Sequence, residues 1–213
     1  MRLATSTLYV VTDAREARGD LRAFLDGVLD AGADIVQLRD KDADVKDLLR
    51  WGPAFRQAAR ARDALFIVND RPDVALAVGA DGVHLGQDDL PPRWARGVLG
   101  PAPLIGLSTH SAEQLAAVPP EVDYVCVGPV YETPTKPDRA ATGIGLVRAA
   151  AARASQAEHP RPWFAIGGLD ASTLPAVVSA GATRAVVVRA VTQASDPAAA
   201  VHTLLRALGR GTV

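Results

Sequence analysis

A regular alternation of two kinds of segment constrains the fold of this chain more than any other feature of its 213 residues. Short runs rich in β-branched residues alternate with longer stretches rich in alanine and arginine, a pattern that predicts strand–helix units. The predicted strands are Leu8–Thr12, Ile35–Arg39, Leu65–Val68, Gly82–Leu85, Leu104–Ser108, Tyr124–Gly128, Trp163–Ile166 and Ala185–Val188. The predicted helices are Leu21–Ala31, Val45–Ala61, Pro72–Ala77, Pro92–Val98, Ala112–Ala117, Ile144–Ala154, Ser172–Ser179 and Pro197–Leu208.

Eight such units predict an α/β fold in which one (β/α)8 TIM barrel spans residues 1–213 as a single domain. An open doubly wound sheet is the alternative, because periodicity alone does not show whether a sheet closes. In a barrel, chemistry is expected on the loops that follow the strands. The polar, acidic and glycine-rich residues concentrate directly after the predicted strands. This distribution favours an enzyme.

The composition narrows the classes of partner. A formal net charge of -1 gives no reason to expect nucleic acid or a membrane surface, so an anionic ligand would need local positive groups. No apolar run approaches the roughly 20 residues that cross a bilayer. A single cysteine, Cys126, fits a reducing compartment, and a cytoplasmic location is expected. The sequence is compatible with a homo-oligomer but does not set the number of subunits.

Acidic residues follow two neighbouring predicted strands. Asp70 comes just after the third strand, and Asp88 and Asp89 come just after the fourth. Adjacent parallel strands lie about 4.8 Å apart, so carboxylates at their ends can converge. Unpaired acids at such a distance repel each other, whereas Mg²⁺ binds one or two carboxylates together with the phosphate oxygens of a substrate. The pattern predicts a metal site for a phosphorylated ligand.

Positive residues at the end of the second strand predict an anion pocket beside that metal. Gln37 and Arg39 share a face with Ile35, which places both in the upper interior of the barrel. A buried arginine needs an anion, and a structural ion pair with Asp40 or Asp70 is the alternative. Lys41, just beyond the strand, favours a phosphate.

A second phosphate pocket is predicted from the loops after strands six, seven and eight. The segment 133–136 offers two hydroxyls and a lysine on a proline-stiffened loop, with a solvated turn as the alternative. Gly167 and Gly168 let backbone amides approach an anion, and Arg189 adds a fork of donors unless it forms an outward salt bridge. Two phosphate pockets beside one metal suit the joining of two phosphorylated substrates, one of which loses diphosphate.

Two other reactive residues are interpreted as structural. Cys126 lies between Val125 and Val127 within a strand, which is typical of a small core residue. His84 lies mid-strand between two apolar residues and is predicted to be a hydrogen-bonded interior histidine rather than a metal ligand.

Taken in order, these segments resemble the thiamine-phosphate synthase family, barrel enzymes that condense the two halves of thiamine. The resemblance runs from Leu8 to Val191. Its most specific segments are QLRDK (37–41), NDR (69–71), GADGVHLGQDDLP (79–91), GLSTH (106–110), VGPVYETPTKP (127–137) and AIGGL (165–169).

The resemblance implies a transferase of thiamine biosynthesis and a set of site residues. Hydroxymethylpyrimidine diphosphate would be held by Gln37, Leu38, Arg39, Asp40, Lys41, Asn69, Ser108 and Lys136. Within that set, the catalytic residues directed at the diphosphate would be Arg39, Lys41, Ser108 and Lys136. One Mg²⁺ per subunit would be held by Asp70 and Asp89. Hydroxyethylthiazole phosphate would be held by Thr133, Pro134, Thr135, Gly168, Val188 and Arg189, where the family often has a small hydroxyl residue in place of Arg189.

Three other functions share this scaffold. A thiazole tautomerase would need neither the Asp70–Asp89 pair nor the Lys41 and Lys136 clamps. A non-catalytic sensor of thiamine precursors would keep both pockets. A sugar-phosphate epimerase or an indole-forming lyase would need a positioned acid–base pair, for which the sequence offers no clear candidate.

Overall fold

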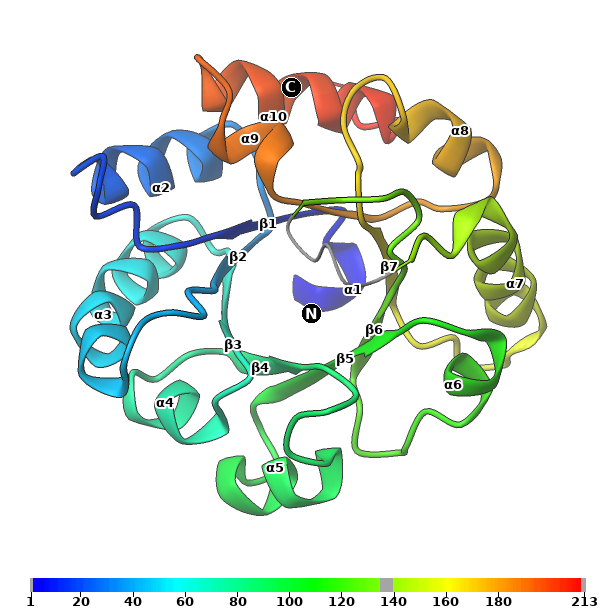
Figure 1. Cartoon of the computed structure of the whole chain (residues 1–213), viewed down its shortest axis with the longest axis horizontal. Coiled ribbons are helices and arrows are strands. Elements are labelled where there is room, and N and C mark those ends of the chain that lie inside the picture. The colour runs from blue at the N-terminus through cyan, green and yellow to red at the C-terminus, as the bar shows by residue number, and fades with distance from the viewer. Residues whose placement is uncertain (1, 135–139, 212–213) are drawn as a thin grey trace.

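The computed structural model describes residues 2–134 and 140–211, and its strands close into a parallel barrel in the order β1 to β8 (Figure 1). Closure decides against the open sheet and confirms the TIM barrel. The strands are β1 (Leu8–Thr12), β2 (Ile35–Leu38), β3 (Leu65–Asn69), β4 (Gly82–Leu85), β5 (Leu104–Thr109), β6 (Tyr124–Val127), β7 (Trp163–Ile166) and β8 (Ala185–Val187). All begin and end within a few residues of the predicted bounds.

The helices other than α1 surround the barrel and largely match the prediction, whereas α1 lies inside the ring of strands in the view of Figure 1. They are α1 (Arg2–Thr5), α2 (Leu21–Asp30), α3 (Val45–Ala61), α4 (Pro72–Ala77), α5 (Pro92–Leu99), α6 (Ala112–Ala116), α7 (Gly143–Gln156), α8 (Leu174–Ser179), α9 (Arg189–Thr192) and α10 (Pro197–Ala207). Helices α1 and α9 were not predicted, because four residues are too few to show a helical period.

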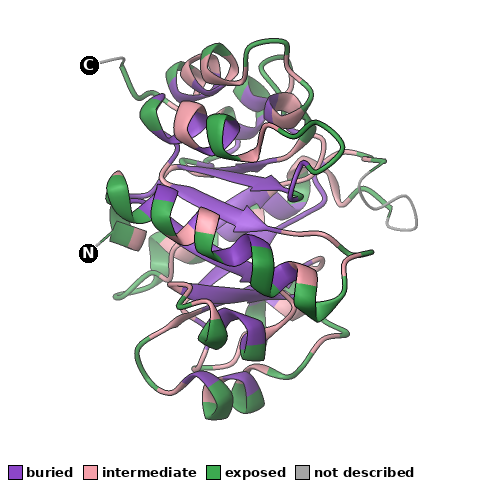
Figure 2. Cartoon of the chain, turned by 90° about the vertical axis from the view of Figure 1, so that its left-hand side faces the viewer, coloured by how far each residue is buried: buried purple, intermediate pink, exposed green. Residues whose placement is uncertain are grey.

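Alternation along each strand divides the apolar residues into two layers. Val10, Val36 and Phe66 point outward and pack against the helices, within the larger core. Tyr9, Ile35 and the other inward residues fill the barrel itself. Figure 2 shows buried strands enclosed by helices whose outward faces are exposed. Within the described residues, no helix is long and apolar enough to cross a membrane.

Three partly buried aspartates lie at the amino-terminal end of the barrel. Asp34, Asp81 and Asp123 each precede a strand, and each accepts backbone N–H groups of a neighbouring strand, for example Phe66 N–H at 2.9 Å from Asp81. Each also pairs with arginine: Asp34 with Arg210, Asp81 with Arg2 and Arg56, and Asp123 with Arg96. These three aspartates therefore have their charge partners within the protein.

Candidate active site

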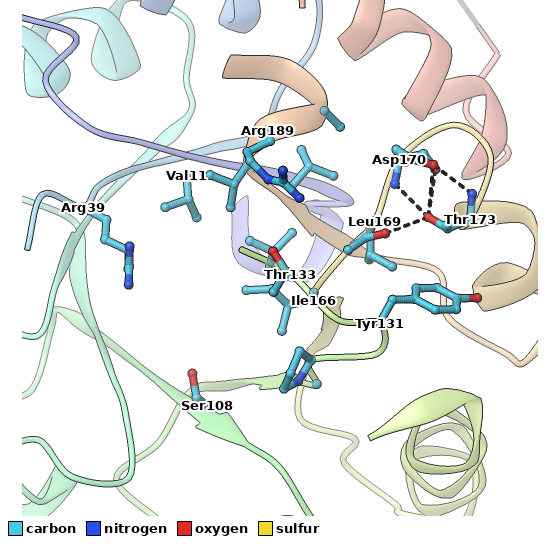
Figure 3. Close-up of a pocket in the computed structure, with 18 of the residues that line it drawn as sticks. Val11, Arg39, Ser108, Tyr131, Thr133, Ile166, Leu169, Asp170, Thr173 and Arg189 are labelled. Atoms are coloured by element: carbon cyan, nitrogen blue, oxygen red, sulfur yellow. Dashed lines mark hydrogen bonds between the residues drawn. The ribbon is translucent and has the colours of Figure 1, made fainter. Parts of the chain in front are cut away.

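The carboxyl ends of the strands surround a pocket of about 550 Å³ (Figure 3). Many of the predicted site residues line it, namely Gln37, Arg39, Asn69, Ser108, Thr133, Gly168, Val188 and Arg189. They come from β2, β3 and β5, from the segments that follow β2, β6, β7 and β8, and from the first residue of α9. The pocket thus joins the two groups of residues that the sequence assigned to two different ligands.

The remaining predicted residues lie elsewhere. Five predicted residues do not line the pocket, namely Asp40, Lys41, Asp70, Asp89 and Pro134. Lys41 and the carboxyl groups of Asp70 and Asp89 nevertheless lie close to one another. The side chain of Leu38 faces the helices and is 1% exposed, so only its backbone can face a ligand. Thr135 and Lys136 lie outside the described residues, and their roles stay predictions.

Arg39 carries a positive charge into the pocket. Burial lowers the pKa of its guanidinium, and the negative charges of Asp70 and Asp40 oppose that effect. Among the residues that the structure describes, no carboxylate lies within 4 Å of this guanidinium. The alternative of a structural ion pair is therefore not realised. A partly buried cation with no acid in contact is suited to bind an anion.

Asp70 and Asp89 form a carboxyl pair next to that cation. Asp70 follows β3 with a φ of 61° and donates its N–H to the carbonyl of His84 at 2.8 Å. Burial raises the pKa of Asp70 to about 6; a hydrogen bond with the Asp89 carboxyl and the charge of Asp89 add to the rise, and Lys41 and Arg39 oppose it. A carboxyl–carboxyl hydrogen bond needs a shared proton, so a cation can take the proton's place.

The Asp70–Asp89 pair is suited to a magnesium ion whose remaining coordination positions are filled by a bound ligand. In the described part of the chain, no three His, Cys, Asp or Glu side chains converge on one point. Mg²⁺ does not need three, because it usually binds one or two carboxylates plus phosphate oxygens and water. Two carboxyl groups in contact, with the cations Arg39 and Lys41 beside them to face the phosphate, fit such an ion.

Glycines bring the loops after β6 and β7 together at the opposite side of the pocket. Gly167 and Gly168 have φ of 103° and 64°, and a Cβ on Gly168 would lie 2.7 Å from the Cβ of Tyr131. Val130 and Tyr131 donate their N–H groups to the carbonyls of Ile166 and Gly167 at 2.8 and 3.1 Å. This pairing places Thr133 at the pocket near Arg189 (Figure 3).

Comparison with known proteins identifies the family. Residues 8–191 match the family model described as thiamine monophosphate synthase. The chain is 54% identical to thiamine-phosphate synthases of Mycobacterium sp. (strain JLS) and Thermobifida fusca (strain YX), over 97% of this chain and 94% of each relative. It is 32% identical to a thiamine phosphate pyrophosphorylase structure from Pyrococcus furiosus, with a TM-score of 0.84 over 98% of this chain and 97% of the other. The chain belongs to the thiamine monophosphate synthase family.

Membership of the thiamine monophosphate synthase family confirms the resemblance drawn from the sequence segments. A 3-hexulose-6-phosphate synthase structure shares the fold with a TM-score of 0.60 but only 21% identity, over 94% of this chain and 99% of that one. That likeness concerns the barrel alone. The family's specific features must therefore lie in the loops and the interior side chains that differ between barrels.

The floor of the pocket contains polar residues that the sequence did not assign to it. His84 lines the pocket, where its Nδ1 lies 3.3 Å from the hydroxyl of Tyr124 and its Nε2 lies 3.0 Å from Oγ of Ser108. The prediction of a hydrogen-bonded interior histidine is confirmed. Its place in the pocket could have been found from strand register, because His84 pairs with Asn69 and has the same inward parity as Ser108.

Apolar and hydroxyl residues that the sequence did not single out complete the wall. Val11, Tyr131, Leu169 and Thr173 all line the pocket. Val11 carries a usable signal, since it is the next inward position of β1 after Tyr9. The others lie on loops, where no periodicity shows which way a side chain points. Cys126 is 1% exposed among the inward residues, as predicted for a core position.

Proposed function

We propose that the protein joins hydroxymethylpyrimidine diphosphate to hydroxyethylthiazole phosphate and releases thiamine phosphate and diphosphate. The observation that carries the proposal is the Asp70–Asp89 carboxyl pair in contact beside Arg39 and Lys41. A tautomerase with no diphosphate to release has no use for such a pair. The names of the relatives agree, since those reported above are thiamine-phosphate synthases.

The pyrimidine substrate would bind at the β2–β5 side of the pocket. Gln37 and Asn69 offer amide groups to the pyrimidine ring, and Ser108 and Arg39 offer donors to its diphosphate. Lys41, close to Asp70, would offer a further donor. Lys136 is proposed to join them. Donors placed around a leaving group stabilise the negative charge that develops on it, and removing one such donor typically costs 10²–10³ in rate.

Asp70 and Asp89 would hold one Mg²⁺ per subunit through their carboxylate oxygens. When bound, the ion would neutralise charge on the departing diphosphate. Asp70 must lose its proton for this, and its raised pKa makes that loss dependent on pH near 6.

The thiazole phosphate would bind at the other side. Thr133, Gly168 and Arg189 border that side and supply a hydroxyl, a close backbone approach and a guanidinium. Pro134, Thr135 and Val188 are proposed to shape the loop around the phosphate. In this fold, loops after the seventh and eighth strands commonly bind phosphate, which supports the assignment.

Bond formation needs no general base in this scheme. The C–O bond of the pyrimidine substrate breaks, its electron pair leaves with diphosphate, and the aminopyrimidine stabilises the remaining methylene cation by resonance. The lone pair of the thiazole nitrogen then forms the C–N bond. The main task of the protein is to hold two reactants in line, which is worth up to roughly 7–11 kcal/mol. We propose that a single barrel domain carries out this reaction. The protein is proposed to act in the cytoplasm and to form a homo-oligomer.

One assay tests the proposal against its rivals. Purified protein is incubated with both phosphorylated halves and Mg²⁺, and thiamine phosphate and diphosphate are quantified. Both products should appear in equal amounts, and omission of either half should abolish both. Binding of both halves without turnover would favour the sensor, and isomerisation of the thiazole alone would favour the tautomerase.

A further inference from the structure

A chain of buried polar groups crosses the barrel beneath the pocket. It runs from Gln37 on β2 through Tyr9 on β1, Tyr124 on β6 and His84 on β4 to Ser108 on β5. Each of the five side chains is at most 6% exposed. Its two ends, Gln37 and Ser108, line the pocket. Buried polar groups are costly unless each is satisfied, so a complete chain here has a defined set of donors and acceptors.

The hydroxyl protons give the chain a direction. Burial raises the pKa of Tyr9 and Tyr124, so both hydroxyls stay protonated and each has one proton to donate. The side-chain N–H of Gln37 donates to the oxygen of Tyr9. Either hydroxyl can donate in the contact between Tyr9 and Tyr124, 3.2 Å long; because Tyr9 already accepts from Gln37, its own proton is available for the oxygen of Tyr124. In that direction the Tyr124 proton is available for Nδ1 of His84 at 3.3 Å, and Nδ1 then carries no hydrogen.

The direction fixes what Ser108 presents to a ligand. A neutral imidazole that accepts at Nδ1 carries its hydrogen on Nε2. His84 therefore donates from Nε2 to Oγ of Ser108 at 3.0 Å. The hydroxyl hydrogen of Ser108 is then left for the pocket. An anionic oxygen that reaches Ser108 meets a donor, whereas the reverse direction would present it with a lone pair.

We propose that Tyr9, Tyr124 and His84 are positioning residues that orient the chain so that Ser108 donates its hydroxyl hydrogen to an anionic ligand oxygen. The same chain holds one amide hydrogen of Gln37 on Tyr9 and leaves its amide oxygen for the ligand. The inference rests on the proposed function in one respect, that the anionic oxygen belongs to the diphosphate of the pyrimidine substrate.

Aromatic rings and a glycine pack around this chain of hydrogen-bonded side chains. The rings of His84 and Tyr124 stack with centroids 5.6 Å apart, and Tyr124 and Phe164 meet edge-on at 5.8 Å. Gly106, on β5 between these rings, leaves the space they need, because a Cβ there would overlap the Tyr124 ring and lie 2.5 Å from Nδ1 of His84. This packing fixes the heavy atoms of the chain, and the amide donor of Gln37 at one end sets its direction.

Nitrogen NMR of protein labelled with ¹⁵N-histidine reads the direction without any assay of activity. The His84 signal is assigned by its loss in His84→Gln. We expect the tautomer with hydrogen on Nε2 in the ligand-free protein. In Tyr124→Phe the preference should weaken, while in Phe164→Leu, which changes packing on the same ring and removes no polar group, it should persist. A hydrogen on Nδ1, or equal tautomers in the wild type, overturns the inference.

Kinetics test whether the chain acts through Ser108. We expect Tyr124→Phe to lower kcat about tenfold, as for a lost hydrogen bond to a developing charge. In a Ser108→Ala background the same substitution should cost less than about twofold, because its effect has no route to the ligand. An undiminished tenfold loss in that background overturns the inference. A protein that makes no thiamine phosphate would instead contradict the proposed function, and the tautomer measurement would still decide this one.

Discussion

The two ends of the barrel handle charge in opposite ways. At the amino-terminal end, Asp81 accepts a hydrogen bond from a backbone N–H and pairs with Arg2 and Arg56 at 3.3 and 3.2 Å. At the carboxyl end, Asp70 meets another carboxyl, and Arg39 has no carboxylate within 4 Å among the described residues. The first arrangement completes itself within the protein. Under the proposed function, the second gains its complement when a phosphorylated ligand and a metal are bound.

The same substitution at the two ends should therefore have opposite effects. Asp70→Asn is expected to lower kcat/KM by about 10²–10³, because it removes a proposed metal ligand beside the leaving group. The asparagine keeps the shape of the side chain and tolerates the φ of 61° at this position, so the fold should persist. Rates of diphosphate release at saturating and limiting Mg²⁺ measure the effect. Full activity of the variant at limiting Mg²⁺ would show that Asp70 does not bind the metal.

The matched change at the other end should affect stability alone. Asp81→Asn leaves two arginines without their partner and weakens the acceptor for the N–H of Phe66, on a side chain that is 14% exposed. We expect a loss of about 2–3 kcal/mol in the free energy of unfolding, with kcat unchanged for the protein that remains folded. Urea unfolding and initial rates at low temperature separate the two quantities. A large drop in kcat with unchanged stability would contradict the contrast between the ends.

The site residues also show which features the sequence could predict and which it could not. Inward parity placed Gln37 and Arg39 correctly, and strand order brought Asp70 and Asp89 together, because both inferences use only local period and neighbouring strands. The contact of His84 with Tyr124 joins β4 to β6 across the barrel and depends on the missing side chain of Gly106. No local pattern encodes such a contact. The roles of the site residues in binding and metal ligation stay predictions.

The pH dependence of the free energy of unfolding tests the environment of the Asp70 carboxyl group directly. The pKa of Asp70 is raised to about 6 from 3.8, so the folded metal-free protein binds a proton more tightly there than the unfolded chain. That contribution is fully present below pH 3.8 and is lost as the pH rises through 6. Asp70→Asn has no such loss. Without Mg²⁺ the variant should be the more stable protein above pH 6, by about 1–2 kcal/mol after allowance for solvent screening.

The measurement is the difference in the free energy of unfolding between Asp70→Asn and the wild type from pH 4 to 8, in the presence of a chelator. The difference should grow through pH 6 and then level off. Asp42→Asn, which removes an exposed carboxylate from the loop after β2, is the matched control and should show a flat difference. A difference that shrinks with rising pH would show that the Asp70 carboxylate is stabilised in the fold, contrary to its contact with Asp89.

The smallest predicted effect concerns the far side of the pocket. Arg189 lines the pocket directly after β8 and has no ion pair in the part of the chain that the structure describes, so the outward salt bridge is not realised. Arg189→Ser should raise KM for the thiazole phosphate about three- to tenfold, the cost of one exposed charge-assisted contact, and leave KM for the pyrimidine diphosphate unchanged. Because exposed charges are screened, the increase should shrink in high salt. An equal rise in both KM values would show that Arg189 serves the whole pocket, and the division of the carboxyl end into two phosphate sites would need to be redrawn.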